Sequence, residues 1–151
     1  MFRGIHQITL DAKGRLSIPA KLRAFFEEES ENKLVMTADI EKNLMIYTLP
    51  QWEAVEAKLT KLPSLDKKAR QLKRLFMGYA SELELDGTGR VLIPGMLRDY
   101  AGLDKKVTLV GMGNKFELWS AERWESQLAA DIDELLEDGV DLDDALGGLS
   151  I

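Results

Sequence analysis

Apolar and polar residues along this chain alternate in short runs, and a period of two is typical of half-buried strands. Predicted strands cover residues 5–10, 16–18, 34–37 and 44–48, and then residues 81–85, 91–93, 107–110 and 115–119. Pro19 and Pro94 each follow the second strand of a group, at the position where a helix would begin. Thr48-Leu-Pro-Gln51 has capping-box spacing and Ser120 is the matching cap candidate, so a helix is expected to close each group.

The two groups of strands belong to an internal repeat. Residues 11–23 return as residues 86–98 with seven of thirteen positions identical, namely Asp, Gly, Arg, Ile, Pro, Leu and Arg. Unrelated segments of this length would match at about one position. The repeat continues at a slightly shorter offset, because residues 47–52 resemble residues 119–124. The chain is therefore two copies of one unit, and its fold class is predicted to be mainly β with added helices.

The predicted boundaries follow from this repeat and from the segments between and after its copies. Residues 1–62 form the first repeat, residues 63–78 a connecting helix, residues 79–137 the second repeat and residues 138–151 an acidic, mobile tail. Within the connecting segment, residues 64–77 are expected to form one amphipathic helix. Its apolar stripe consists of Leu65, Ala69, Leu72, Leu75 and Phe76.

Each repeat contains a short turn with aspartate at its first position and glycine at its fourth. This pattern suits a type I turn closed by a glycine with positive φ, and the aspartate can accept backbone N–H groups and pair with the following arginine. Side chains alternate along a strand, so Arg15 and Arg90 are expected to face away from the core. The residues expected to structure the turns are Asp11, Gly14, Asp86 and Gly89.

Charge is distributed unevenly along the chain. The net charge is −6, yet residues 117–151 carry eleven acidic residues and one basic residue, whereas residues 1–116 have a net charge of +4. Such asymmetry suggests a polyanionic partner for the basic part. A guanidinium that pairs with one carboxylate keeps donors for a phosphate or a guanine edge. The candidate DNA-binding residues are Arg3, Lys13, Arg15, Lys21 and Arg90, with Arg23 nearby in sequence.

Two details limit this interpretation. The turns could serve only to pin two hairpins, which would give the aspartates, glycines and arginines a purely structural role. The second copy also has Thr88 and Met96 where the first has Lys13 and Lys21. If both copies bind a polyanion, the first copy is expected to dominate.

The composition excludes several kinds of chemistry. The chain has no cysteine and one histidine, so disulfides, thiolate metal sites and sites with two imidazoles are excluded. No P-loop or dinucleotide fingerprint is present, and no cofactor, metal or small-molecule substrate is expected. Asp11 and Asp86 could be read as a carboxylate pair for acid–base catalysis, but they belong to equivalent turns, so no enzyme is predicted. Without an apolar run of ~20 residues or a signal-like start, we expect a cytoplasmic protein with no membrane partner.

The doubled Asp-x-x-x-Arg turn, followed each time by Ile-Pro and a helix, resembles the MraZ family of bacterial transcriptional regulators. This family is part of the AbrB-like superfamily. Phe2-Arg3-Gly4, residues 11–23, residues 47–52 and the chain length carry the resemblance, which covers everything except the tail after about Glu137. The Asp and Arg of the family motif correspond to the first and last residues of Asp11–Arg15 and Asp86–Arg90.

The resemblance implies a fold, an assembly and a function. The fold would be a double-split β-barrel built from tandem AbrB-like halves, and the chains would form a ring-shaped homo-oligomer. The implied partner is double-stranded DNA, at direct repeats in the promoter of the division and cell-wall gene cluster. The protein would act there as a nucleoid-associated repressor. The alternative is a protein-interaction scaffold or an antitoxin-like module without specific DNA binding.

Overall fold

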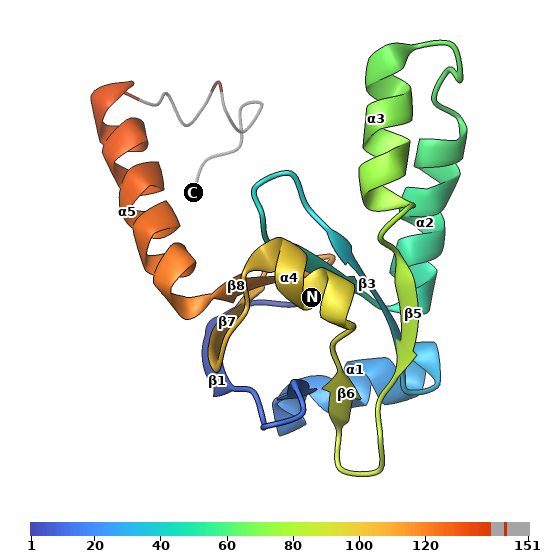
Figure 1. Cartoon of the computed structure of the whole chain (residues 1–151), viewed down its shortest axis with the longest axis vertical. Helices are drawn as coiled ribbons and strands as arrows, with labels where there is room; N and C mark the ends of the chain where they lie inside the picture. Colours follow the sequence, from blue (N-terminus) through green and yellow to red (C-terminus); the bar gives the residue numbers. More distant parts are fainter. Residues whose placement is uncertain (140–143, 145–151) are drawn as a thin grey trace. The chain divides into compact units, whose positions relative to one another are not determined.

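A computed structural model of the chain describes residues 1–139 and residue 144 (Figure 1). The chain divides into two compact units, Met1–Ala121 and Glu122–Ile151. The strands are β1 (Ile5–Thr9), β2 (Arg15–Ser17), β3 (Lys33–Ala38), β4 (Leu44–Tyr47), β5 (Ser81–Glu84), β6 (Arg90–Leu92), β7 (Lys106–Gly111) and β8 (Phe116–Ser120). The helices are α1 (Ala20–Ser30), α2 (Leu49–Thr60), α3 (Lys67–Phe76), α4 (Gly95–Ala101) and α5 (Ala121–Glu137).

The order of the elements repeats, as the sequence predicts. Two strands, a helix, two strands and a helix occur twice, with α3 between the copies. The prediction of sheet structure with added helices is confirmed. The offset between the repeats falls from 75 residues at the starts of α1 and α4 to 73 at those of β3 and β7 and to 72 at those of β4 and β8. The predicted tail, residues 138–151, lies almost entirely outside the described residues.

The strands of the two repeats are interleaved. A six-stranded antiparallel sheet has the order β1-β7-β8-β4-β3-β5, so the first strand of each repeat pairs with the later hairpin of the other repeat. The strands β2 and β6 form a separate two-stranded antiparallel ribbon, in which Leu16 lies opposite Val91. The two repeats therefore fold together rather than as separate domains.

This pairing corrects one expectation. The sequence predicts that the strands flanking each aspartate turn form a hairpin, but β1 pairs with β7 while β2 pairs with β6. The turn itself closes, since the N–H of Asp11 donates to the carbonyl of Arg15 at 3.1 Å, and beyond it the two strands diverge. The described strand pairings leave β1 and β5 as the edges of the larger sheet, so the double-split barrel stays a prediction.

Both faces of the central strands are covered, which explains their continuous burial. Along β3, Leu34 and Met36 point into the larger core, whereas Val35 points into a second core beneath α2 and α3. The larger core draws on both repeats and is closed on one side by the inner face of the ribbon, with Leu16 and Val91 buried. The ribbon is thereby held against the sheet while its other face remains outside.

The helix that connects the repeats is shorter than the sequence predicts. The α3 helix begins after Asp66, whose side chain accepts from the N–H of Lys68 at 3.2 Å and caps it. Leu65, expected on the apolar stripe, therefore precedes the helix and is 93% exposed.

The cap predicted at Thr48 is present at the start of α2, because its hydroxyl accepts from the N–H of Gln51. In Figure 1, α2 and α3 stand together at one end of the first unit and β6 lies at the other.

Candidate functional site

Two equivalent turns flank the β2–β6 ribbon. In each turn the glycine N–H donates to the aspartate carbonyl, at 2.9 Å from Gly14 and 3.0 Å from Gly89. Both glycines have positive φ, 83° and 77°, a region that other residues rarely adopt. The turn geometry inferred from the Asp and Gly spacing is therefore present in both copies.

The aspartate side chain organises each turn from within. Oδ1 of Asp11 accepts from the backbone N–H groups of Lys13 and Arg15, both at 2.9 Å. Asp86 binds the N–H groups of Thr88 and Arg90 in the same way, and the Thr88 hydroxyl adds a third bond to it at 2.8 Å. Each carboxylate is thus committed to its own turn, which argues against a shared catalytic pair.

Each aspartate also holds one edge of the following arginine. Nε of Arg15 lies 2.5 Å from Oδ2 of Asp11, and Nε of Arg90 lies 3.1 Å from Oδ2 of Asp86. In the part of the chain that the structure describes, no hydrogen bond or ion pair engages the terminal nitrogens of either guanidinium. The two arginine side chains are 29% and 37% exposed, so four N–H groups on each remain available to a ligand.

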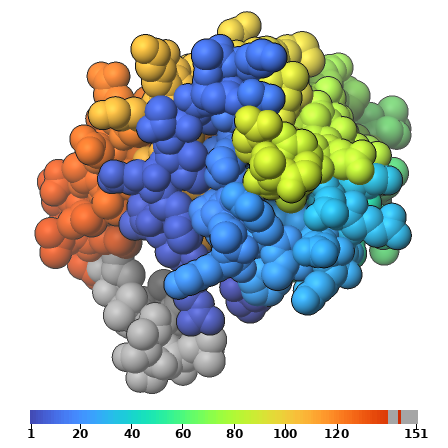
Figure 2. All heavy atoms as spheres, turned by 90° about the horizontal axis from the view of Figure 1, so that it is seen from below, coloured from blue at the N-terminus to red at the C-terminus, as the bar shows by residue number. Residues whose placement is uncertain are grey.

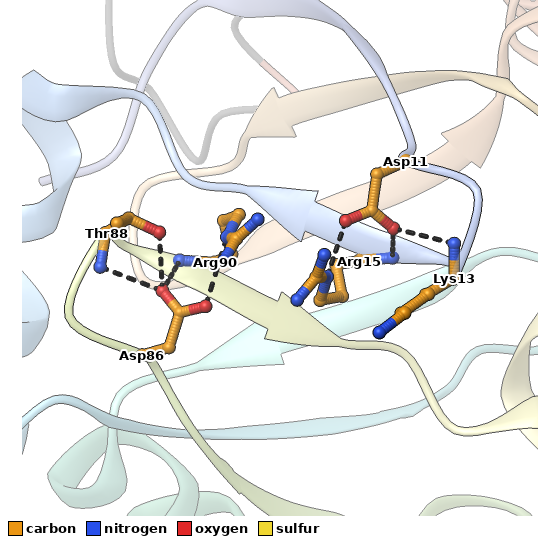
Figure 3. A network of polar contacts seen from close by, with 6 residues as sticks. All are labelled: Asp11, Lys13, Arg15, Asp86, Thr88 and Arg90. Atoms are coloured by element: carbon orange, nitrogen blue, oxygen red, sulfur yellow. Dashed lines mark hydrogen bonds and ion pairs between the residues drawn. The ribbon is translucent and has the colours of Figure 1, made fainter.

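The two arginines share the outer face of the ribbon. Arg15 lies opposite Leu92 and Arg90 lies opposite Ser17, which makes the arginines diagonal neighbours across the two strands. Figure 3 shows the carboxylates of Asp11 and Asp86 toward opposite ends of the ribbon, with the guanidinium groups of Arg15 and Arg90 between them. In Figure 2, blue segments of the first repeat and yellow-green segments of the second lie beside each other on one surface.

The hydrogen bonds within the turns lower the pKa of both aspartates. The main cause is the backbone N–H of Arg15 for Asp11 and that of Arg90 for Asp86, because these donors bind the ionised carboxylate more strongly than the neutral acid. A lowered pKa in the folded state contributes stability above the ordinary pKa of aspartate. This contribution is lost as the pH falls through the folded-state value.

We therefore expect both turn carboxyl groups to titrate below the ordinary aspartate pKa of 3.8. Carbon-13 NMR of the side-chain carboxyl signals between pH 2 and pH 6 would show whether either group titrates at the ordinary value, with Asp11→Asn and Asp86→Asn used to assign the signals. At neutral pH the turns should stay ionised and formed. A midpoint at or above the ordinary value would show that the backbone N–H groups do not hold the carboxylates in solution.

The other predicted basic residues are distributed unequally. Lys13 lies at the tip of the first turn and Lys21 in the first turn of α1, directly beyond β2, and both are exposed. Arg3 lies at the other end of β1, where its backbone packs against Gly111. The structure therefore groups Lys13 and Lys21 with the ribbon, while Arg3 is separated from the turn by the length of β1.

Two residues near the ribbon, Leu92 and Arg98, were not among the predicted site residues, and Arg23 was expected only as part of a basic patch near Arg15. Leu92 is 53% exposed on the outer face beside Arg15, and alternation along β6 implies this position once Val91 is placed inside. Arg23 and Arg98 lie against the turn glycines. The sequence signal that could have identified them is that both occupy the same position of the repeat. The site is thus a ribbon face whose ends are supported from both repeats.

Among the described residues, no group of three or more histidine, aspartate or glutamate side chains could hold a metal ion. The helices of residues 1–139 include none that is long and apolar enough to cross a bilayer.

The ribbon shared by the two repeats thus carries one partly exposed arginine from each repeat on its outer face. A family model described as "MraZ protein, putative antitoxin-like" matches the chain twice, over residues 1–75 and 75–142. The chain belongs to the MraZ family.

Individual relatives agree with this assignment. The protein named Transcriptional regulator MraZ of Hydrogenovibrio crunogenus is 53% identical over 126 residues, covering 83% of each chain. The proteins of the same name from Alkalilimnicola ehrlichii and Coxiella burnetii are each 49% identical over the whole length of both chains. The family and these names support a role in transcription regulation rather than an enzymatic one.

Proposed function

We propose that this protein regulates transcription by binding double-stranded DNA with the outer face of the β2–β6 ribbon. The major groove of B-DNA is about 12 Å wide and admits a two-stranded β-ribbon. Arg15 and Arg90 are diagonal neighbours on this face, a relation that places such residues about 7–8 Å apart. Both guanidinium groups can therefore enter one groove together.

The observation that carries this proposal is the way each aspartate binds its arginine. Only Nε is engaged, so the carboxylate fixes the orientation of the guanidinium and leaves its terminal edge open. A bidentate contact from that edge to O6 and N7 of guanine contributes about 1–3 kcal/mol of discrimination. Lys13 and Lys21 would add phosphate contacts, which position the protein without reading sequence.

Several finer parts of the proposal rest on the family resemblance. The target would be direct repeats in the promoter of the division and cell-wall gene cluster, where the protein acts as a nucleoid-associated repressor in the cytoplasm. A ring-shaped homo-oligomer would present one ribbon per subunit to successive repeats. Linked weak contacts of this kind can gain about 10²–10⁴ in avidity, which would offset the acidic net charge of each chain.

The salt dependence of binding tests the phosphate contacts. We expect the logarithm of the association constant to fall linearly with the logarithm of salt concentration, with a slope of about −0.9 for each phosphate engaged. Fluorescence anisotropy with a promoter duplex that carries the direct repeats, and with a scrambled duplex of equal length, would measure this. A flat salt titration, or equal affinity for both duplexes, would refute specific DNA binding through the ribbon.

The description "antitoxin-like" in the family model supports a second candidate, a module that binds a partner protein. Purification of the full chain from its natural host separates the two possibilities. A stoichiometric protein partner with no retained DNA would favour the module, whereas recovery of promoter fragments would favour the regulator.

A further inference from the structure

Arg23 and Arg98 occupy equivalent positions in the two repeats and make the same contact in each. Nε of Arg23 donates to the carbonyl of Ile18 at 2.7 Å, and Nε of Arg98 donates to the carbonyl of Ile93 at 3.1 Å. Both isoleucines directly follow a strand of the ribbon. Each guanidinium is thereby fixed at the residue that follows the ribbon strand of its own repeat.

The same two arginines lie against the turn of the other repeat. A Cβ added at Gly14 would lie 2.5 Å from Nη1 of Arg98, and one added at Gly89 would lie 2.2 Å from Nε of Arg23. Only the absence of a side chain on these glycines permits so close an approach. The first turn is therefore supported by an arginine of the second repeat, and the second turn by an arginine of the first.

A backbone bond completes each support. The N–H of Ile93 donates to the carbonyl of Gly14 at 3.2 Å, while the carbonyl of the same isoleucine accepts from Arg98. In the other half, the N–H of Ile18 donates to the carbonyl of Gly89 at 2.9 Å. Each turn glycine is thus connected through one isoleucine to the arginine that covers it.

We propose that Arg23 and Arg98 are positioning residues that act crosswise, with Arg98 holding the turn of Arg15 and Arg23 holding the turn of Arg90. This inference rests on the proposed function, because it assigns the arginines that keep the DNA-contacting groups in place. The turn and its arginine move together, since each aspartate binds both the backbone and Nε of that arginine. A turn that loses its support gains conformational freedom, which must be removed again on binding.

A double-mutant cycle on DNA affinity tests the crosswise pattern. We expect Arg98→Ala to weaken binding about tenfold, within the range observed for coupled neighbours, but to have little further effect when Arg15→Ala is already present. Combined with Arg90→Ala, the effect of Arg98→Ala should remain in full. Arg23→Ala should have little further effect when Arg90→Ala is present and should keep its full effect when combined with Arg15→Ala. Multiplicative effects in every combination, or coupling within the same repeat, would overturn the proposal.

A measurement without DNA separates this inference from the proposed function. In the NMR spectrum of the full chain, Arg98→Ala should shift the Nε–H signal of Arg15 more than that of Arg90, and Arg23→Ala should do the reverse. Arg98→Lys, which keeps the charge but loses the planar group, should behave like the alanine variant and serves if that variant does not fold. Equal shifts at both turns would refute positioning. Unchanged DNA affinity in Arg15→Ala would instead refute the proposed function alone.

Discussion

Replacement of Arg15 by alanine is expected to remove sequence-specific DNA binding while leaving the fold intact. The side chain is partly exposed on the outer face of the ribbon, and the core beneath it is filled by Leu16 and Val91. Loss of one bidentate contact costs about 1–3 kcal/mol, which is roughly 5- to 150-fold in affinity for each engaged subunit. Anisotropy titration of the promoter duplex would measure the loss, and circular dichroism would verify the fold.

Matched variants make this experiment specific. Arg74→Ala removes the same side chain from α3, at the opposite end of the first unit from the ribbon, and should leave the affinity unchanged (Figure 1). Arg15→Lys keeps the charge without the bidentate fork, so it should retain affinity for a scrambled duplex but lose the preference for the promoter. Wild-type affinity and preference in Arg15→Ala would contradict the proposed interface.

The two copies should contribute unequally to binding. Arg90→Ala is expected to weaken binding less than Arg15→Ala, because the second copy has Thr88 and Met96 where the first has two lysines. Thr88 carries no charge that could contact a phosphate, and its hydroxyl already donates a hydrogen bond to Asp86. This asymmetry follows from the sequence alone and remains a prediction.

Local chemistry made the turns predictable from the sequence. The positive φ of Gly14 and Gly89 and the carboxylate bonds of Asp11 and Asp86 depend on residues within five positions of one another. The outward direction of the arginines required only the alternation of side chains along a strand. These features therefore appear in the structure as the spacing implies.

Long-range pairing was not predictable in the same way. A strand such as β2 is apolar on its inner face whichever partner it has, so the sequence does not distinguish a local hairpin from pairing with β6. The support of each turn by Arg23 and Arg98 depends on that pairing and was missed for the same reason. Leu65 was placed in the helix because the apolar spacing extends to it. The helix instead begins at Lys67, after the cap at Asp66, and the apolar spacing alone does not reveal that start.

The interleaving of the repeats predicts how the chain unfolds. Phe26 of α1 is fully buried and stacks with Phe2 at 5.9 Å and with Phe116 of the second repeat at 6.4 Å between ring centroids. Phe26→Ala should lower the free energy of unfolding by about 3–5 kcal/mol, because it removes a large buried ring and leaves a cavity. Since this core is shared, both repeats should lose stability together, although the change lies in the first.

Urea unfolding monitored by circular dichroism and by tryptophan fluorescence would test this, in variants that keep one of the three tryptophans, either Trp52 to report on the first repeat or Trp119 to report on the second. We expect coincident transitions that shift together to lower urea in Phe26→Ala, as all-or-none unfolding requires. Leu65→Ala, at a 93% exposed position, is the control and should change the free energy of unfolding by less than about 0.5 kcal/mol. A second repeat that kept its own transition would show that each copy folds alone, and the shared ribbon would then have to form only after folding.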